Sequence, residues 1–236
     1  MYTKYDARMK AYEKLASQAI PKELPMIIRV DGKAFHTYTK GLEKPHDPNI
    51  TMVFALAAAA TAKHIQMCEL VYTQSDEVSF IVMNHLLGEN GDPWFGGKVQ
   101  KITSIAASIF TSYFSMYAME FLPHKKQAFF DARTYPMPRD EIKNYLRWRQ
   151  MDCTRNCWLG YGQYYIGKKQ THGLKVHEIK TLLNDLEGEH CIPSEAEING
   201  WVAIKEPHTF MSTNRKTGEE TEVKRSQWII EAADKF

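Results

Sequence analysis

The sequence lacks a long apolar run and contains few cysteines. Its longest apolar stretch, residues 52–60, falls well short of the roughly 20 residues that a membrane-spanning helix requires. Residues 1–20 carry charges throughout and have no apolar segment of the kind found in a secretory signal peptide. The four cysteines form no CxxC motif, so we expect free thiols in a reducing cytoplasm rather than disulfides or a zinc site.

An excess of charge of one sign is also missing. The chain has 30 Lys and Arg against 28 Asp and Glu, which leaves a formal net charge of +2. Such a balance neither favours nor excludes a nucleic-acid partner, because partners interact with local charge rather than with the total. With 236 residues, 44% of them hydrophobic, the chain can bury a sizeable core. Disordered, collagen-like and disulfide-stabilised miniature proteins are therefore excluded.

The order of apolar runs, prolines and glycines predicts an α+β fold. We expect helices over residues 2–19, from Pro48 (with Asp47 as N-cap) to about Cys68, over residues 98–122, and after Pro138. We expect strands over residues 26–30, in a hairpin over residues 69–83, over residues 127–133, and in a final pair over residues 200–206 and 226–232 whose tip is formed by residues 213–220. Up to residue 133 this order is close to βαββαβ, the ferredoxin-like arrangement of a polymerase palm, in which helices pack on an antiparallel sheet.

Acidic residues stand at the ends of two predicted strands. Asp31 follows the first strand and precedes Gly32, while Asp76 and Glu77 lie at the tip of the hairpin. These two strands commonly lie in one sheet in a βαββ unit, so Asp31 and Asp76 are expected to meet at one edge. Paired carboxylates suit Mg²⁺, which takes oxygen ligands. Ordinary solvated turns are the alternative, and the residues alone leave both interpretations open.

The turn after Asp31 has features of a phosphate-binding segment. Its successive N–H groups could point at a triphosphate, and Lys33, Lys40 and Lys44 are nearby cations. These lysines could equally be solvated surface residues. His36, at the end of the turn, could be a satisfied structural histidine.

Basic and aromatic residues alternate over residues 139–169. The window contains seven Lys and Arg against three Asp and Glu, a net charge of +4, together with two Trp and four Tyr. Basic groups bind phosphates and aromatic rings stack on unpaired bases. An amphipathic helix with a charged outer face and an aromatic core face is the alternative, and it accounts for about half of these residues.

The chain resembles the tRNA-histidine guanylyltransferase family in five segments that occur in the family's order: IIRVDGKAFHTYTKGLEKPHD, YTQSDEVSF, KITSIAASIFTSYF, FFDARTYPMP and NYLRWRQMDCTRN. They are more similar to its bacterial-type branch, the guanylyltransferase-like 3′-to-5′ RNA polymerases, than to the eukaryotic enzymes. The resemblance covers roughly residues 25–160. It implies a palm fold with a C-terminal helical and β-hairpin extension, tRNA and nucleoside triphosphates as partners, and a homotetramer.

The resemblance also implies roles for individual residues. Asp31, the Gly32 carbonyl and Asp76 would hold two Mg²⁺ ions, and Glu77 matches a neighbouring carboxylate that the family needs. Residues of the nucleotide site would be Asp31, Gly32, Lys33, Ala34, Phe35, His36, Lys44, Ser75 and Asp76. Positions for tRNA would be Arg133, Arg149, Arg155 and Asn156, with Arg29, Gln150 and Asp152 at further motif positions. Residues 1–135 would form the palm-like catalytic core, and residues 136–236 a tRNA-handling helical region with a β-rich tail, in one continuous unit.

One departure from the family pattern refines the expected activity. Eukaryotic members have a His after the WRQxDC block, where this chain has Thr154. The change favours template-dependent repair of tRNA 5′ ends, using ATP and GTP or other NTPs, over addition of a single G to tRNA-His. A palm-type nucleotide cyclase and a non-catalytic RNA-binding module are the alternatives from other classes.

Overall fold

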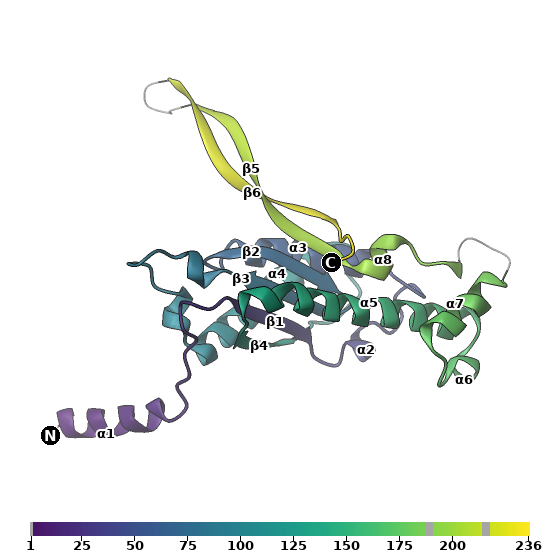
Figure 1. The fold of residues 1–236 in the computed structure, drawn as a ribbon, viewed down its shortest axis with the longest axis horizontal. Coiled ribbons are helices and arrows are strands. Elements are labelled where there is room, and N and C mark those ends of the chain that lie inside the picture. Colours follow the sequence, from purple (N-terminus) through teal and green to yellow (C-terminus); the bar gives the residue numbers. More distant parts are fainter. Residues whose placement is uncertain (1, 187–190, 214–217) are drawn as a thin grey trace.

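Residues 2–186, 191–213 and 218–236 are described in a computed structural model, where they form a six-stranded antiparallel sheet with helices on both faces (Figure 1). The strands are β1 (Met26–Gly32), β2 (Cys68–Gln74), β3 (Glu77–Val82), β4 (Phe130–Pro136), β5 (Trp201–Thr213) and β6 (Glu220–Ala232). Their order across the sheet is β4-β1-β3-β2-β5-β6. The first four strands have the arrangement of a ferredoxin-like βαββαβ unit, which confirms the predicted α+β class.

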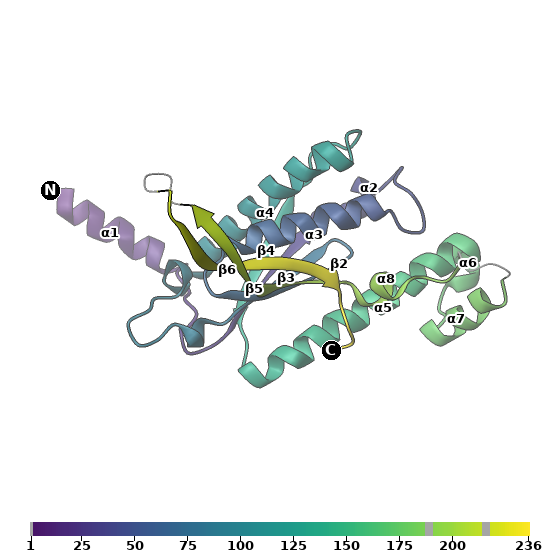
Figure 2. The same cartoon turned by 90° about the horizontal axis from the view of Figure 1, so that it is seen from above.

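Helices lie on each face of this sheet. The described helices are α1 (Tyr2–Lys14), α2 (Phe35–Tyr38), α3 (Pro48–Ala62), α4 (Val99–Phe121), α5 (Ile142–Tyr165), α6 (Lys168–Thr171), α7 (Val176–Asn184) and α8 (Glu195–Asn199), with short 3₁₀ turns at Asn84–Leu86, Trp94–Gly97 and Arg139–Glu141. Helices α3 and α4 cover one face, and α5 covers the other (Figure 2). Helix α1 projects away from the sheet, and α6 and α7 pack together near the C-terminal end of α5 (Figure 1).

Side-chain alternation along β1 creates the two cores. Ile28 and Val30 are fully buried against α3 and α4, whereas Ile27 is fully buried on the face covered by α5. Successive residues of a strand point to opposite faces, so a central strand covered on both sides is apolar at nearly every position. This explains why every residue from 26 to 30 except Arg29 is apolar.

The chain continues beyond the palm-like unit into a long β-hairpin. The first part of β5 pairs with β2, from Trp201 opposite Thr73 to Ile204 opposite Leu70. Strands β5 and β6 pair with each other over 13 positions, from Trp201 opposite Ala232 to Thr213 opposite Glu220. The part of this hairpin beyond β2 projects away from the rest of the sheet (Figure 1). Both strands are longer than predicted, and half of the predicted tip, residues 214–217, lies outside the described residues.

Other predicted boundaries were also wrong. Helix α1 ends at Lys14 instead of residue 19, and α3 ends at Ala62. Met67 adopts a left-handed conformation (φ 58°) ahead of β2, so the chain cannot remain helical up to Cys68. Strand β4 begins three residues later than predicted because its pairing with β1 starts at Gly32 opposite Phe130, which leaves residues 127–129 without a partner strand. The predicted Asp47 cap is confirmed, since its carboxylate accepts hydrogen bonds from the N–H groups of Asn49 and Ile50.

Two further findings concern the sequence features considered first. Within the described ranges, no helix is both long enough and apolar enough to cross a membrane. All four cysteines are free thiols.

Candidate active site

The β2–β3 hairpin brings Asp76 beside the end of β1. Strands β1 and β3 pair so that Asp31 lies opposite Glu77, and the N–H of Gly32 donates to the carbonyl oxygen of Asp76 over 3.0 Å. Ser75 and Asp76 form the turn between β2 and β3, with Ser75 in a left-handed conformation (φ 50°). Asp31 and Asp76 therefore meet at one edge of the sheet, as the sequence predicts.

The carboxyl groups of Asp31 and Asp76 have no cationic partner within 4 Å among the described residues. Burial raises the pKa of Asp76, and the negative charge of Asp31 raises it further. Burial also raises the pKa of Asp31. Two partly buried carboxylates that disfavour each other's ionised form would be stabilised by a divalent cation. Their hard oxygen donors fit Mg²⁺.

A third acidic residue, Asp131, lies beside this pair and was not among the site residues predicted from the sequence. It is directly opposite Asp31 in the β1–β4 register, and its charge contributes to the raised pKa of Asp31. Arg133, two residues along β4, forms a 3.9 Å ion pair with Asp131. Its positive charge lowers the pKa of Asp31 and so opposes the effect of Asp131. The alternation in FFDAR could have placed Asp131 and Arg133 on one face, had the start of β4 been correctly located.

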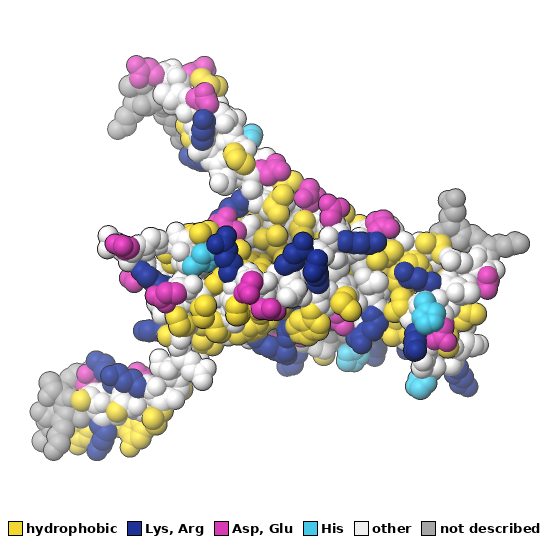
Figure 3. Space-filling model, viewed as in Figure 1, with side chains coloured by type: hydrophobic (Ala, Val, Ile, Leu, Met, Phe, Trp, Pro, Cys, Tyr) yellow, Lys and Arg dark blue, Asp and Glu magenta, His cyan; other side chains and the backbone are white. Residues whose placement is uncertain are grey.

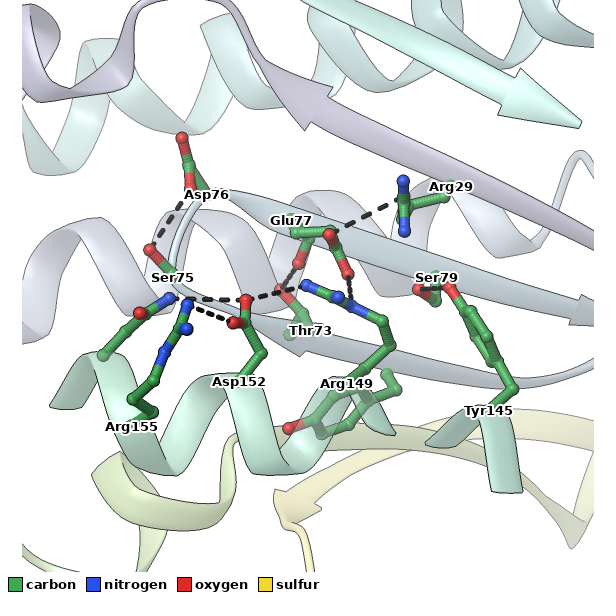
Figure 4. A network of polar contacts seen from close by, with 12 residues as sticks. Arg29, Thr73, Ser75, Asp76, Glu77, Ser79, Tyr145, Arg149, Asp152 and Arg155 are labelled. Atoms are coloured by element: carbon green, nitrogen blue, oxygen red, sulfur yellow. Dashed lines mark hydrogen bonds and ion pairs between the residues drawn. The ribbon is translucent and has the colours of Figure 1, made fainter. Parts of the chain in front are cut away.

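Glu77 does not face the same partners as Asp76, although the two are neighbours in sequence. Its carboxylate accepts a 2.7 Å hydrogen bond from Nε of Arg149 in α5, and Arg29 lies 3.7 Å away (Figure 4). Burial raises the pKa of Glu77, and the two arginines partly offset this effect. Glu77 therefore joins the sheet to α5 through a buried ion pair.

The network continues along α5 through Asp152. Arg149 donates to Asp152 over 2.9 Å, and Arg155 donates to its other oxygen over 2.8 Å (Figure 4). The amide of Asn156 also donates to Asp152, over 3.4 Å. Arg155 and Asn156 are exposed, but Arg149 is only 7% exposed. Arg149 is thus mostly buried and held by the carboxylates of Glu77 and Asp152, whereas its predicted role at tRNA stays a prediction.

Gln150 and Thr154, which the family motif singles out, also have structural partners. The Gln150 amide donates to the backbone oxygens of Asn199 and Asp234. The Thr154 hydroxyl donates to the carbonyl of Ile198 over 3.1 Å. Both residues therefore hold α5 against the segments that flank β5 and β6.

A cavity of about 360 Å³ lies beside Asp76, and we call it the Lys44 cavity. Residues of four segments line it: Phe35 and His36 from α2, residues 42–47 from the following loop, Ile50, Thr51 and Phe54 from α3, and Ser75 and Asp76 from the hairpin turn. Five of the nine residues expected at a nucleotide site thus line a single cavity, namely Phe35, His36, Lys44, Ser75 and Asp76.

Two of the other expected residues, Lys33 and Ala34, do not line the Lys44 cavity. They belong to a separate cavity, described below. Gly32 adjoins this turn and permits a close approach, since a Cβ at that position would lie 2.1 Å from the Phe35 ring. A larger residue would therefore displace the Phe35 ring, which forms part of the Lys44 cavity wall.

The basic and aromatic window lies mainly on α5, and Lys and Arg side chains line this face of the molecule in Figure 3. Six of its seven basic residues are exposed, all except Arg149. Three of its aromatic residues, Tyr145, Trp158 and Tyr161, are buried, whereas Trp148 and Tyr164 are more than half exposed. The window therefore combines a core face with a basic outer surface, and both interpretations made from the sequence apply to part of it.

Comparison with known proteins identifies the family. The family model described as "Thg1: tRNAHis guanylyltransferase" matches residues 6–138. Among curated proteins, tRNA(His) guanylyltransferase 2 of Arabidopsis thaliana is 33% identical over 137 residues, which is 56% of this chain and 24% of that protein. The tRNA(His) guanylyltransferase of Schizosaccharomyces pombe is 32% identical over 153 residues, 63% of this chain and 56% of that protein. The chain thus spans between a quarter and somewhat over half of these relatives' length.

Solved structures match over nearly the whole chain. A bacterial tRNA(His) guanylyltransferase (Thg1)-like protein in complex with ATP is 31% identical, with a TM-score of 0.82 over 97% of this chain and 91% of that chain. The same coverage holds for a bacterial Thg1-like protein in complex with GTP, at 32% identity and a TM-score of 0.73. The fold is thus that of the bacterial Thg1-like structures, and in this chain two carboxylates, Asp31 and Asp76, meet at the edge of its sheet. The chain belongs to the tRNAHis guanylyltransferase family.

Proposed function

We propose that this chain is a nucleotidyltransferase that adds nucleotides to the 5′ end of tRNA in the 3′-to-5′ direction, guided by a template strand. Its substrates would be ATP, GTP and other NTPs, and it would act in the cytoplasm as a homotetramer. The two bacterial Thg1-like proteins that bind ATP and GTP, and that match nearly the whole chain, support nucleotides as substrates.

The composition of the Lys44 cavity carries this proposal. Segments that are about 30 residues apart in sequence place a lysine, a histidine and a serine around one space next to Asp76. The Lys44 ammonium group and the Ser75 hydroxyl are groups that bind phosphate oxygens. Phe35 contributes an apolar wall. Small-molecule sites typically combine such walls with a few polar groups in cavities of at least about 300 Å³.

The paired carboxylates supply the proposed metal site. Asp31, the Gly32 carbonyl and Asp76 would hold two Mg²⁺ ions, which when bound lower the pKa of an attacking hydroxyl and neutralise the leaving group. No three His, Cys, Asp or Glu side chains converge in a metal-binding group within the described part of the chain. Substrate phosphate oxygens and water would therefore complete the coordination, as is usual for Mg²⁺.

The proposed reaction needs positioning more than covalent catalysis by the protein. The 3′-hydroxyl oxygen of an incoming NTP forms a bond to the 5′-terminal phosphorus of the RNA, and pyrophosphate or AMP leaves from the activated end. Lys44 and Ser75 hold the phosphates, and the exposed basic residues of α5, including Arg155, attract the RNA. Glu77 acts indirectly, through the buried pair that fixes α5 relative to the hairpin. Phosphoryl transfer is accelerated mainly by such positioning and charge neutralisation.

Addition of a single G to tRNA-His is the second candidate, because the curated relatives are tRNA(His) guanylyltransferases. Thr154 favours the template-dependent reaction. It replaces the histidine of the eukaryotic motif, and its hydroxyl is already bonded to the Ile198 carbonyl.

The test is extension of a tRNA that lacks its first 5′ nucleotide, with each NTP supplied in turn and with each opposite-strand base. We expect the complementary nucleotide to be added for every template base. Addition of G alone, whatever the opposite base, would support the second candidate. A cyclic nucleotide formed without RNA, or RNA binding without addition, would refute the proposal.

A further inference from the structure

A second cavity, of about 410 Å³, lies next to the segment that follows Asp31. We call it the Lys126 cavity. One wall is formed by Lys33, Ala34, Thr37 and Tyr38, and the other by residues 124–129 of the α4–β4 connection. Helix α2 contributes to both cavities, with Phe35 and His36 lining the Lys44 cavity and Thr37 and Tyr38 lining this one.

The Lys126 cavity is basic. Lys33, His124, Lys125 and Lys126 line it, and no acidic side chain does so among the described residues. Lys125 is held in place, because its ammonium group donates to the Lys40 carbonyl over 2.6 Å and lies 5.4 Å from the Tyr38 ring centroid. Within the described part of the chain, no ion pair or hydrogen bond engages the side chains of Lys33, His124 or Lys126. The cavity thus concentrates positive charge that no protein group neutralises.

Two further features indicate the kind of ligand. The Tyr38 hydroxyl is buried without a hydrogen-bond partner, although Tyr38 lines the cavity. Phe129, at the rim, is 56% exposed. An unpaired donor among ammonium groups is suited to phosphate oxygens, and an exposed ring next to them is suited to stacking on a base.

The location of the cavity connects it with the candidate active site. The N–H of Lys33 donates to the Phe129 carbonyl over 2.9 Å, and Gly32 pairs with Phe130 in the sheet. The wall of the Lys126 cavity therefore begins one residue after the proposed metal-binding edge. An RNA strand whose 5′ end reaches Asp31 and Asp76 would have its adjoining phosphates near the lysines of the Lys126 cavity.

We propose that the Lys126 cavity binds the phosphate backbone of the RNA strand adjoining the reacting end, with Phe129 stacking on an unpaired base. The inference deepens the proposed function and rests on it for the identity of the RNA. RNA is favoured over a free nucleotide because the cavity combines several lysines with an exposed aromatic ring at an open surface. A free NTP already has the Lys44 cavity, which reaches Asp76.

The test uses the full chain and a fluorescently labelled tRNA lacking its first 5′ nucleotide. Dissociation constants for this RNA and for ATP are measured at several salt concentrations. Lys126→Glu is expected to weaken RNA binding roughly 5-fold or more and to reduce the slope of log K against log salt by about 1, while the ATP constant stays unchanged. Phe129→Ala is expected to weaken RNA binding by roughly 5-fold with an unaltered salt slope. Lys63→Glu is the matched control, because Lys63 is exposed just beyond the far end of α3 and lines neither cavity.

RNA binding that is unchanged by Lys126→Glu, or weakened equally by Lys63→Glu, would overturn the inference. Weaker ATP binding with normal RNA binding would assign the cavity to a free nucleotide and would overturn it as well. If Lys126→Glu lowers the melting temperature, Lys126→Gln gives the same readout with a smaller perturbation. The assay measures binding only, so a wild-type protein that binds RNA through this cavity but adds no nucleotide would refute the proposed function alone.

Discussion

Arg149 of α5 donates a 2.7 Å hydrogen bond to Glu77 of β3, and both side chains are about nine-tenths buried. The residue after the proposed metal-binding Asp76 is thus tied to the helix that carries the exposed basic surface. The same guanidinium reaches Asp152, which in turn holds Arg155 and Asn156. A single buried group therefore couples the hairpin turn to residues at the surface of α5.

Arg149→Met is expected to lower the free energy of unfolding by about 3 kcal/mol, because it leaves the Glu77 carboxylate buried without its hydrogen-bonded partner and with Arg29, 3.7 Å away, as its remaining cationic neighbour among the described residues. Urea denaturation measures the change. Arg155→Met is the control, since Arg155 pairs with Asp152 at the surface and should change stability by less than about 1 kcal/mol. Adding Glu77→Gln to Arg149→Met should restore part of the loss. An Arg149→Met protein as stable as the Arg155→Met protein would contradict the importance of this pair.

The metal-free protein is expected to lose stability as the pH rises from about 4 towards neutrality. Burial raises the pKa of Asp31, Asp76 and Glu77 above their ordinary values. The folded protein therefore holds protons that the unfolded chain has already released, and this advantage disappears as the pH passes through the raised values. Thermal unfolding in EDTA over this pH range tests whether stability falls as the pH rises. Asp76→Asn should make the melting temperature depend less steeply on pH. Added Mg²⁺ should stabilise the protein increasingly with pH, because it competes with protons for the carboxylates.

Asp31→Ala and Asp76→Ala are each expected to reduce nucleotide addition by at least about 100-fold, the typical cost of losing a group that stabilises the transition state. Their dissociation constants for tRNA should stay within a factor of two, since neither carboxylate is proposed to contact RNA. Single-turnover extension and fluorescence anisotropy give the two readouts. Asp140→Ala, a change at an exposed acidic residue ahead of α5, should leave both unaffected. Addition retained by Asp76→Ala would refute the metal assignment.

The palm-like unit could be predicted from the sequence because each of its elements has a strong local signal. Residues 26–30 are apolar at nearly every position, as expected for a strand covered on both faces. Asp47 and Pro48 mark the start of α3, and turn residues divide the β2–β3 hairpin. These signals depend only on residues close together in the chain, so they can be recognised without knowledge of the tertiary structure.

Features that depend on distant partners could not be predicted in the same way. The start of β4 is set by where β1 ends, and this error concealed Asp131 opposite Asp31. The buried ion pair between Arg149 and Glu77 was not predicted, because the two residues are far apart in the sequence and no local pattern joins them. The residues of the turn after Asp31 were expected around one triphosphate, whereas α2 divides them between two cavities.

Lys44→Ala is expected to raise the dissociation constant for ATP by about 10-fold or more, consistent with the loss of a hydrogen bond to a charged group, worth about 1.5–3 kcal/mol. Lys40→Ala is the matched control. Lys40 is an exposed lysine four residues earlier, and its side chain lines neither cavity. Calorimetric titration of both variants makes the comparison. Equal losses would indicate a general effect of positive charge rather than a contact in the Lys44 cavity.

Asp47→Ala should affect stability and nucleotide binding together. One carboxylate oxygen caps α3 through the N–H groups of Asn49 and Ile50, and the other accepts from the N–H of Glu43. The side chain therefore fixes both ends of the loop that carries Lys44. Loss of the cap should cost about 0.5–2 kcal/mol in urea denaturation, and the released loop should weaken ATP binding less than Lys44→Ala does. Asp47→Asn retains one acceptor oxygen and should recover most of the stability. Normal ATP affinity in an Asp47→Ala protein that is measurably destabilised would show that this loop does not position Lys44.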